Sequence, residues 1–141
     1  MNEPVRLQFD DFSIDDEIAA LRAVSRRIGG IATFLGCVRD FSEGREVTQI
    51  GFDAHEVMAL CELQTLRAQA IERFALIEAR IVHRLGAVSA GENIVLIAAA
   101  AEHRAPALEA CRWLIDELKA RAPIWKKEIT PDGDAWVAPH P

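Results

Sequence analysis

Apolar residues recur along the chain with two different periods, and these periods predict the secondary structure. Spacings of three and four residues are typical of a helix with one buried face, whereas short apolar or alternating runs predict strands. The pattern predicts helices over residues 14–28, 57–74 and 106–120, and strands over residues 5–9, 31–38, 48–54, 77–85, 94–101, 124–129 and 135–137.

Single residues mark the boundaries of several of these elements. Ser13 is a candidate N-cap, and Gly29–Gly30 is expected to end the first helix. Pro106 fits the first turn of the last helix, and Gly36 predicts a bulge in the second strand. That strand, residues 31–38, is almost wholly apolar, so we expect it at the centre of its sheet.

The order of the elements indicates the fold class. Strands and helices that do not alternate strictly are typical of an α+β protein, and we expect a two-layer sandwich. The chain has 141 residues and half of them are hydrophobic, which fits one domain spanning residues 1–141.

Charge and hydropathy exclude several classes of function. The formal net charge is -6, whereas broad nucleic-acid binding needs a basic surface. The N-terminus lacks the basic and apolar segments of a signal peptide, and the longest apolar run, Ile94 to Ala101, is too short to cross a bilayer. We therefore expect a soluble, cytoplasmic protein that binds neither nucleic acid nor membranes.

The three cysteines, Cys37, Cys61 and Cys111, are widely spaced. An odd number without a Cys-x-x-Cys pair argues against a disulfide framework and against a zinc site. Each cysteine falls in an apolar run, so we expect all three in the core. We expect no metal and no cofactor.

A basic cluster interrupts this acidic chain between Leu118 and Glu128. It holds three lysines, one arginine and a tryptophan around Pro123, which ends the preceding helix. The chain then returns as a strand, so Lys119 at the helix end can approach Lys126. The alternative is structural, because cations in a last helical turn interact favourably with the helix dipole and most charge runs are solvated faces.

Three further cations are candidates for an anion site. Arg39 follows the apolar strand, although it could instead pair with an acidic neighbour in the next loop. His103 and Arg104 stand at a helix N-terminus, where free N–H groups already favour an anion. Their counter-anion is either Glu102 or the phosphate of a ligand, and the sequence leaves both open.

Several segments occur together in the order and spacing of one known family. They are Phe34–Arg39, His83–Gly86, Gly91–Glu92, His103–Arg104, Ile115–Lys119, Pro123–Glu128, Asp132–Gly133 and Trp136. From about Gly30 to Trp136 the sequence resembles the catalytic (large) subunit of molybdopterin synthase.

The resemblance implies an α/β hammerhead-like fold with a small additional antiparallel sheet. It implies a sulfurtransferase of molybdenum-cofactor biosynthesis, which converts cyclic pyranopterin monophosphate to molybdopterin. Two sulfurs come from the thiocarboxylated C-terminus of a small ubiquitin-like partner subunit. A homodimer of large subunits within a heterotetramer is the expected assembly.

The resemblance also implies roles for individual residues. Lys119 and Lys126 are the catalytic residues, Arg39, His103 and Arg104 bind the substrate phosphate, and Phe34, Ile115 and Lys127 contact the partner's tail. One alternative is a non-catalytic dimeric module that binds the tail of a small ubiquitin-like protein, and the presence of both catalytic lysines argues against it. A weaker alternative is a ferredoxin-like regulator, which would need no converging lysines.

Overall fold

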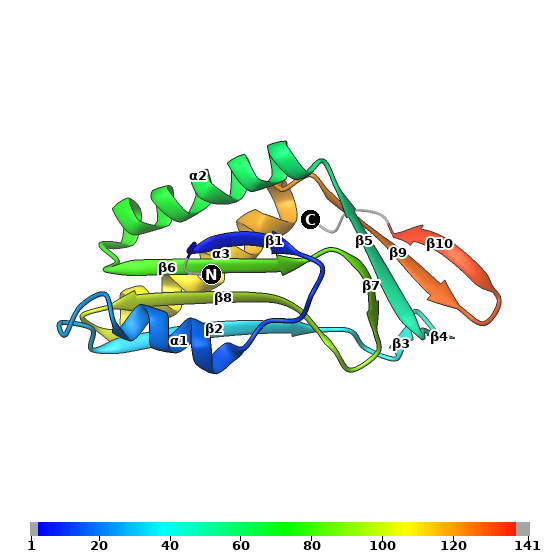
Figure 1. Ribbon diagram of the computed structural model, residues 1–141, viewed down its shortest axis with the longest axis horizontal. Coiled ribbons are helices and arrows are strands. Elements are labelled where there is room, and N and C mark those ends of the chain that lie inside the picture. Colours follow the sequence, from blue (N-terminus) through cyan, green and yellow to red (C-terminus); the bar gives the residue numbers. More distant parts are fainter. Residues whose placement is uncertain (1–2, 138–141) are drawn as a thin grey trace.

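Two β-sheets lie end to end along an elongated molecule, and helices cover the larger one (Figure 1). The computed structural model describes residues 3–137. The larger sheet contains, in spatial order, β1 (Val5–Gln8), β6 (Glu78–Arg84), β8 (Asn93–Ala101) and β2 (Gly30–Cys37). The smaller, antiparallel sheet contains β10 (Gly133–Val137), β9 (Ile124–Thr130), β5 (Gln49–Ala54) and β7 (Gly86–Ser89), and a separate hairpin joins β3 (Phe41–Ser42) to β4 (Arg45–Glu46).

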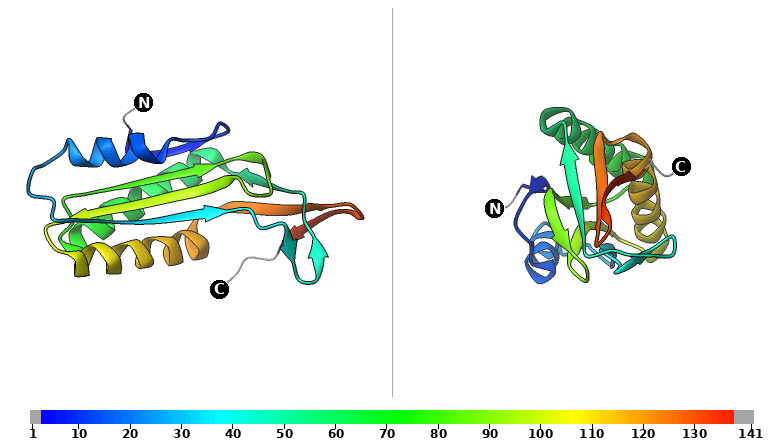
Figure 2. Two further views of the ribbon diagram at one scale, coloured as in Figure 1. Left: turned by 90° about the horizontal axis from the view of Figure 1, so that it is seen from below. Right: turned by 90° about the vertical axis from the view of Figure 1, so that its right-hand side faces the viewer.

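The larger sheet has helices on both faces (Figure 2). On one face lies α1 (Ile14–Arg22), and on the other lie α2 (Glu56–Phe74) and α3 (Arg104–Arg121). Residues of β8 alternate between the two sides: Ile97 and Ala99 pack in the core under α2 and α3, whereas Ala98 and Ala100 pack under α1. The expected α+β class with a small additional sheet is confirmed, and α1 adds a third layer over part of the sheet.

The expectation that residues 31–38 form a central strand is wrong. β2 lies at the edge of the larger sheet and pairs only with β8 among the described strands. It is nevertheless apolar on both sides, because Ala32 packs in the core under α2 and α3 while Ile31 packs against the α1 side. Its predicted bulge is confirmed by a shift of register between Gly36 and Cys37.

The first helix is shorter than predicted. Ser13 caps its start as expected, since its hydroxyl accepts a hydrogen bond from the backbone of Asp16, but the helix ends at Arg22 rather than at Gly29–Gly30. Gly29 serves a close chain crossing instead, because a Cβ atom there would lie 2.0 Å from the carbonyl oxygen of Glu102.

The second helix begins and ends close to its predicted bounds. His55 is its N-cap: the ring Nδ1 accepts a hydrogen bond of 3.2 Å from the backbone N–H of Met58. No helix within residues 3–137 is long and apolar enough to span a membrane.

Candidate active site

All three lysines of the chain lie around the turn that joins α3 to β9. Lys119 is in the last turn of α3, and Ala122 and Pro123 then turn the chain into β9. The strand carries Lys126 back alongside the helix end, where the charge of Lys119 acts on it. The predicted approach of Lys119 to Lys126 is therefore confirmed.

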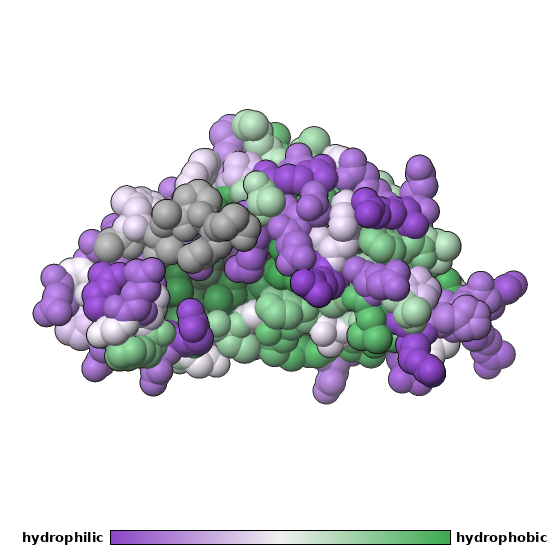
Figure 3. Space-filling model, turned by 180° about the vertical axis from the view of Figure 1, so that it is seen from behind, coloured by the Kyte–Doolittle hydropathy of each residue, from purple (hydrophilic) through white to green (hydrophobic). Residues whose placement is uncertain are grey.

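These two lysines line a cavity of about 890 Å³ between the end of β2, the β3–β4 hairpin, the end of α3 and β9. Arg39 lines the same cavity. Within residues 3–137, none of the three cations forms an ion pair with a carboxylate. Around them the lining mixes apolar side chains with polar ones, among them Glu43 and the Arg45–Glu128 pair. Figure 3 shows hydrophobic side chains gathered over the middle of one face between hydrophilic ends. Four cations against two carboxylates leave an excess of positive charge in the lining, which favours an anionic ligand.

Partial burial makes the ammonium group of Lys126 less stable than that of an exposed lysine. Burial lowers the pKa of Lys126, and the nearby charges of Lys119 and Arg39 lower it further, while Glu128 opposes them. Lys126 therefore releases its proton at a lower pH than an ordinary lysine does, which suits a group that transfers protons.

Removing Lys119 should raise the pKa of Lys126 towards the ordinary lysine value of 10.5. In Lys119→Met, the pH profile for acylation of the Lys126 amine should then shift to higher pH, because only the neutral amine reacts. Peptide mass spectrometry after brief labelling measures this rate, and Lys127 in the same sample is the internal control. An unshifted profile would show that the two amines do not interact.

The carboxylate beside Lys126 is already engaged. Glu128 is buried on the same strand face as Lys126, and it accepts a hydrogen bond of 2.7 Å from Arg45 of β4. This ion pair fastens the β3–β4 hairpin over one side of the cavity. It also explains why Glu128 does not neutralise Lys126 by direct pairing.

Two other cations of the basic cluster lie outside this arrangement. Arg121 bonds to Glu62 of α2 at 2.8 Å and to Glu117, so it joins two helices. Lys127 pairs with Asp134 at 3.4 Å and lies over the ring of Trp136, and it does not line the cavity. Of the residues expected to contact a partner's tail, Phe34 and Ile115 line the cavity and Lys127 does not.

His103 and Arg104 lie far from Arg39 within one chain. Arg104 opens α3 and Lys119 is in its last turn, so the helix separates them by about 22 Å at a rise of 1.5 Å per residue. One chain therefore does not bring together the three expected phosphate ligands. Glu102, the possible internal counter-anion, pairs with Arg27 at 3.2 Å, and neither His103 nor Arg104 forms an ion pair within the described part of the chain.

Only one cysteine lies in the core as expected. Cys111 is buried, and burial raises the pKa of its thiol to about 11. Cys61 is exposed on α2, and Cys37 is exposed where β2 ends, on the wall of the cavity. The apolar-run argument failed for Cys37 because an edge strand leaves its last residues uncovered.

Substituting Cys37 by Ser tests whether a thiol of this chain takes part in the chemistry. If the sulfur arrives on a partner, as the resemblance implies, no thiol is needed here, and we expect the rate of product formation to stay within about threefold of wild type. Surface changes of this kind also cost little stability. Cys61→Ser is the matched exposed control. Complete loss of activity in folded Cys37→Ser would point to a persulfide on this chain.

Residues without a sequence signal complete the cavity. His83 of β6 and Phe52 of β5 form part of its lining, and the hairpin adds Phe41 and Arg45. His83 belongs to a recognised motif but carried no assigned role. His83 lines the cavity because the fold places β6 near β5, and these two strands are separate in sequence.

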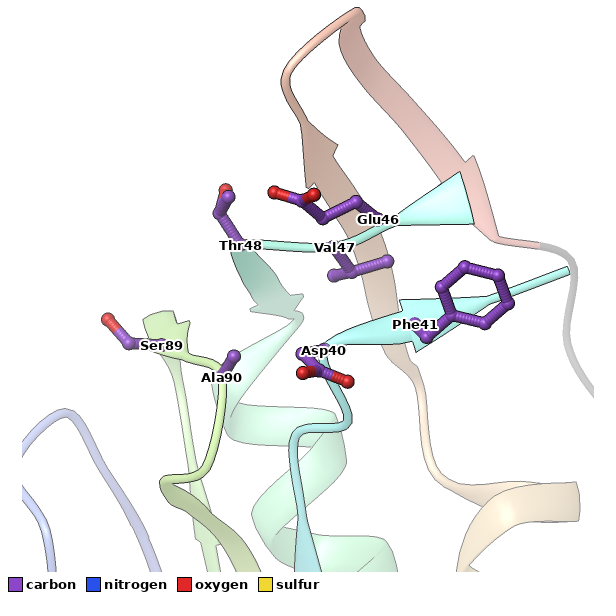
Figure 4. A pocket seen from close by; sticks show the side chains of 7 residues that line it. All are labelled: Asp40, Phe41, Glu46, Val47, Thr48, Ser89 and Ala90. Atoms are coloured by element: carbon purple, nitrogen blue, oxygen red, sulfur yellow. The ribbon is translucent and has the colours of Figure 1, made fainter. Parts of the chain in front are cut away.

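A smaller hollow of about 480 Å³ lies on the other side of the hairpin (Figure 4). Its rim carries the carboxylates of Asp40 and Glu46, and no cationic residue lines it within the described part of the chain. Of these two cavities, the one that holds the lysines is therefore the favourable one for an anionic ligand.

The fold and this cavity define an α+β protein with a cationic site for a small anionic ligand at the end of a helix. A family model described as "MoaE protein" matches residues 7–121. The chain belongs to this family.

Similar proteins of known structure or curated name agree with the assignment. The chain is 42% identical over 128 residues to the molybdopterin synthase catalytic subunit of Pyrococcus abyssi, which covers 91% of this chain and 85% of that protein. The MoaE protein of Burkholderia ambifaria has a TM-score of 0.84 at 39% identity, covering 97% of this chain and 90% of that one. Molybdopterin synthase from Staphylococcus aureus has a TM-score of 0.89 at 27% identity, covering 96% and 98%.

Proposed function

We propose that this protein is the catalytic subunit of a molybdopterin synthase, a sulfurtransferase of molybdenum-cofactor biosynthesis. It converts cyclic pyranopterin monophosphate to molybdopterin. The observation that carries the proposal is the set of three cations, Arg39, Lys119 and Lys126, which share one cavity without a carboxylate partner.

The sulfur arrives on a small ubiquitin-like partner whose C-terminal tail ends in a thiocarboxylate. The tail enters the cavity along Phe34 and Ile115, and Lys119 and Lys126 hold its negative charge. The thiocarboxylate sulfur is the nucleophile: it forms a bond to a substrate carbon while the bond from that carbon to an oxygen breaks, and the departing oxygen takes up a proton. The bond between the sulfur and the acyl carbon then breaks with water, which returns the tail as a carboxylate. Lys126, with its lowered pKa, is suited to move protons in these steps.

The direct test combines the purified protein with its thiocarboxylated partner and pyranopterin monophosphate. Molybdopterin formation is the expected result, and the partner with an ordinary C-terminal carboxylate is the control. Binding of the partner without product formation would favour a non-catalytic module.

We also propose that the chain folds as one domain and acts in the cytoplasm as a homodimer with one small subunit at each end.

The phosphate site is the reason to propose a homodimer. His103 and Arg104 lack a counter-anion within the described part of the chain and lie far from Arg39, so a second copy must supply them if the three bind one phosphate. A helix N-terminus with an exposed cation is well suited to that role. Pocket and helix end would then come from different subunits.

Arg104→Ala should weaken the binding of pyranopterin monophosphate by about 10- to 100-fold, since a charge-assisted hydrogen bond contributes about 1.5–3 kcal/mol. Binding of the small partner should change much less. Titration calorimetry measures both affinities. Arg112→Ala is the matched control, because Arg112 is an exposed arginine of the same helix whose pair with Asp116 is long, at 3.7 Å.

Mixing two impaired variants, at a substrate concentration too low to saturate Arg104→Ala, separates a shared site from a site within one chain. If the site is shared, dimers formed from Arg104→Ala and Lys119→Ala subunits contain one cavity with both residues intact, and activity returns. If each chain builds its own site, every cavity lacks one residue and activity stays low. The second result would remove His103 and Arg104 from the neighbouring active site.

A further inference from the structure

A buried histidine lines the same cavity as the lysines. His83 lies in β6, where it pairs with Val95 of β8 and Leu7 of β1, and only 4% of its surface is exposed. Its Nδ1 is 2.6 Å from the carbonyl oxygen of Arg84. A carbonyl oxygen only accepts, so Nδ1 carries the proton and donates it. The other ring nitrogen, Nε2, is left with a free lone pair.

This lone pair opens into the cavity. Nε2 makes no hydrogen bond in the part of the chain that the structure describes. Yet no fully buried side-chain nitrogen or oxygen atom in that part lacks a partner, so Nε2 must be accessible, and the cavity is the space that His83 lines. Phe52 holds the ring from the side in an edge contact, with 5.2 Å between the centroids.

The imidazole is neutral and stays so. Burial lowers the pKa of His83 to about 4, and the charge of Lys119 acts in the same direction. At neutral pH the ring is therefore a hydrogen-bond acceptor at Nε2 that adds no further positive charge to the cavity. A carboxylate in this place would neutralise the charge that the anionic ligand needs.

The donor that this acceptor lacks is present in the same cavity. The ammonium of Lys119 has three N–H groups, and within residues 3–137 it has no hydrogen-bond partner. We propose that His83 is a positioning residue for the sulfur transfer: its Nε2 accepts a hydrogen bond from the Lys119 ammonium through one water, or directly after a change of the lysine rotamer, and so directs this group into the cavity. The inference rests on the proposed function for its catalytic consequence, whereas the pairing itself does not depend on that function.

Nuclear magnetic resonance of the histidine ring nitrogens tests the pairing without any reaction. In wild type, the ring of His83 should show a protonated Nδ1 and an unprotonated Nε2. Lys119→Met should shift the Nε2 resonance, because the hydrogen bond to the lone pair is lost, while Lys127→Met should not. An Nε2 resonance that is the same in wild type and Lys119→Met overturns the proposal.

Kinetics test the consequence with two variants. His83→Leu removes the acceptor at similar volume and should lower kcat by about 10²-fold, the cost of misplacing a catalytic group, with the affinity for the small partner within twofold. His83→Gln keeps an acceptor oxygen and should recover most of the rate. Circular dichroism confirms folding, and wild-type kcat in folded His83→Leu overturns the positioning role. Where His83→Leu does not fold, the resonance test and His83→Gln still decide. If the wild-type protein makes no molybdopterin, the proposed function is wrong. The resonance test still decides whether His83 interacts with Lys119.

Discussion

Lys119→Ala should lower the rate of molybdopterin formation by about 10²–10⁴-fold, the range for a lost acid–base or charge-stabilising group. Lys119 lies at the exposed end of α3, beside the buried Leu118 rather than inside the core, so its removal leaves the fold intact. It also lacks a carboxylate partner within the described residues, so the substitution strands no buried charge. The loss should therefore fall on the chemistry.

The measurement compares single-turnover rates at saturating partner and substrate. Arg112→Ala, at an exposed position of the same helix, should retain the wild-type rate. Lys119→Arg keeps the charge but spreads it over a planar group, and we expect only part of the rate to return. A Lys119→Ala protein that turns over at near-normal rate would remove this lysine from the mechanism.

Sequence signals that act locally predicted their parts of the fold correctly. Ser13 at a helix start, Pro123 at a helix end and Gly36 at a bulge each act through the backbone of their own segment, so no distant contact is needed to interpret them. The prediction that Lys119 approaches Lys126 was correct for the same reason, since one tight turn joins the two residues.

Features that depend on the neighbours of a segment in the fold could not be predicted from the sequence. β2 is apolar because helices cover both of its faces, and hydropathy alone cannot distinguish such an edge strand from a central one. The separation of Arg39 from Arg104 depends on the direction of α3, which no spacing encodes. The role of the His83 Nε2 could not be inferred from the sequence, because it depends on the contact with Phe52 and on the cavity beside the ring.

A buried carboxylate that binds two arginines outside the cavity lining should contribute strongly to stability. Glu17 of α1 is buried against the larger sheet and accepts hydrogen bonds of 2.6 Å from Arg6 of β1 and 2.8 Å from Arg80 of β6. Burial alone would raise the pKa of Glu17, but the two guanidinium groups outweigh it and the pKa lies below its ordinary value of 4.5. This carboxylate therefore fastens α1 to two neighbouring strands.

Glu17→Gln should lower the free energy of unfolding by about 3–5 kcal/mol, because it removes the charge of a buried carboxylate that Arg6 and the buried Arg80 share. Each kcal/mol shifts the melting temperature of a domain of this size by about 3–4 °C, so the melting temperature should fall by about 10–20 °C. Glu109→Gln, at an exposed position of α3 that makes no ion pair within the described part, should change stability by no more than about 0.5 kcal/mol.

The effect should also depend on pH in one direction. Because folding lowers the pKa of Glu17, its stabilising contribution is complete above pH 4.5 and is lost as the pH falls through the folded-state pKa. Urea unfolding of wild type and Glu17→Gln should therefore differ most near neutral pH and converge in acid. Equal stability of the two proteins at neutral pH would mean that the arginines find other partners. Undiminished activity of the folded variant would agree with the distance of Glu17 from the cavity.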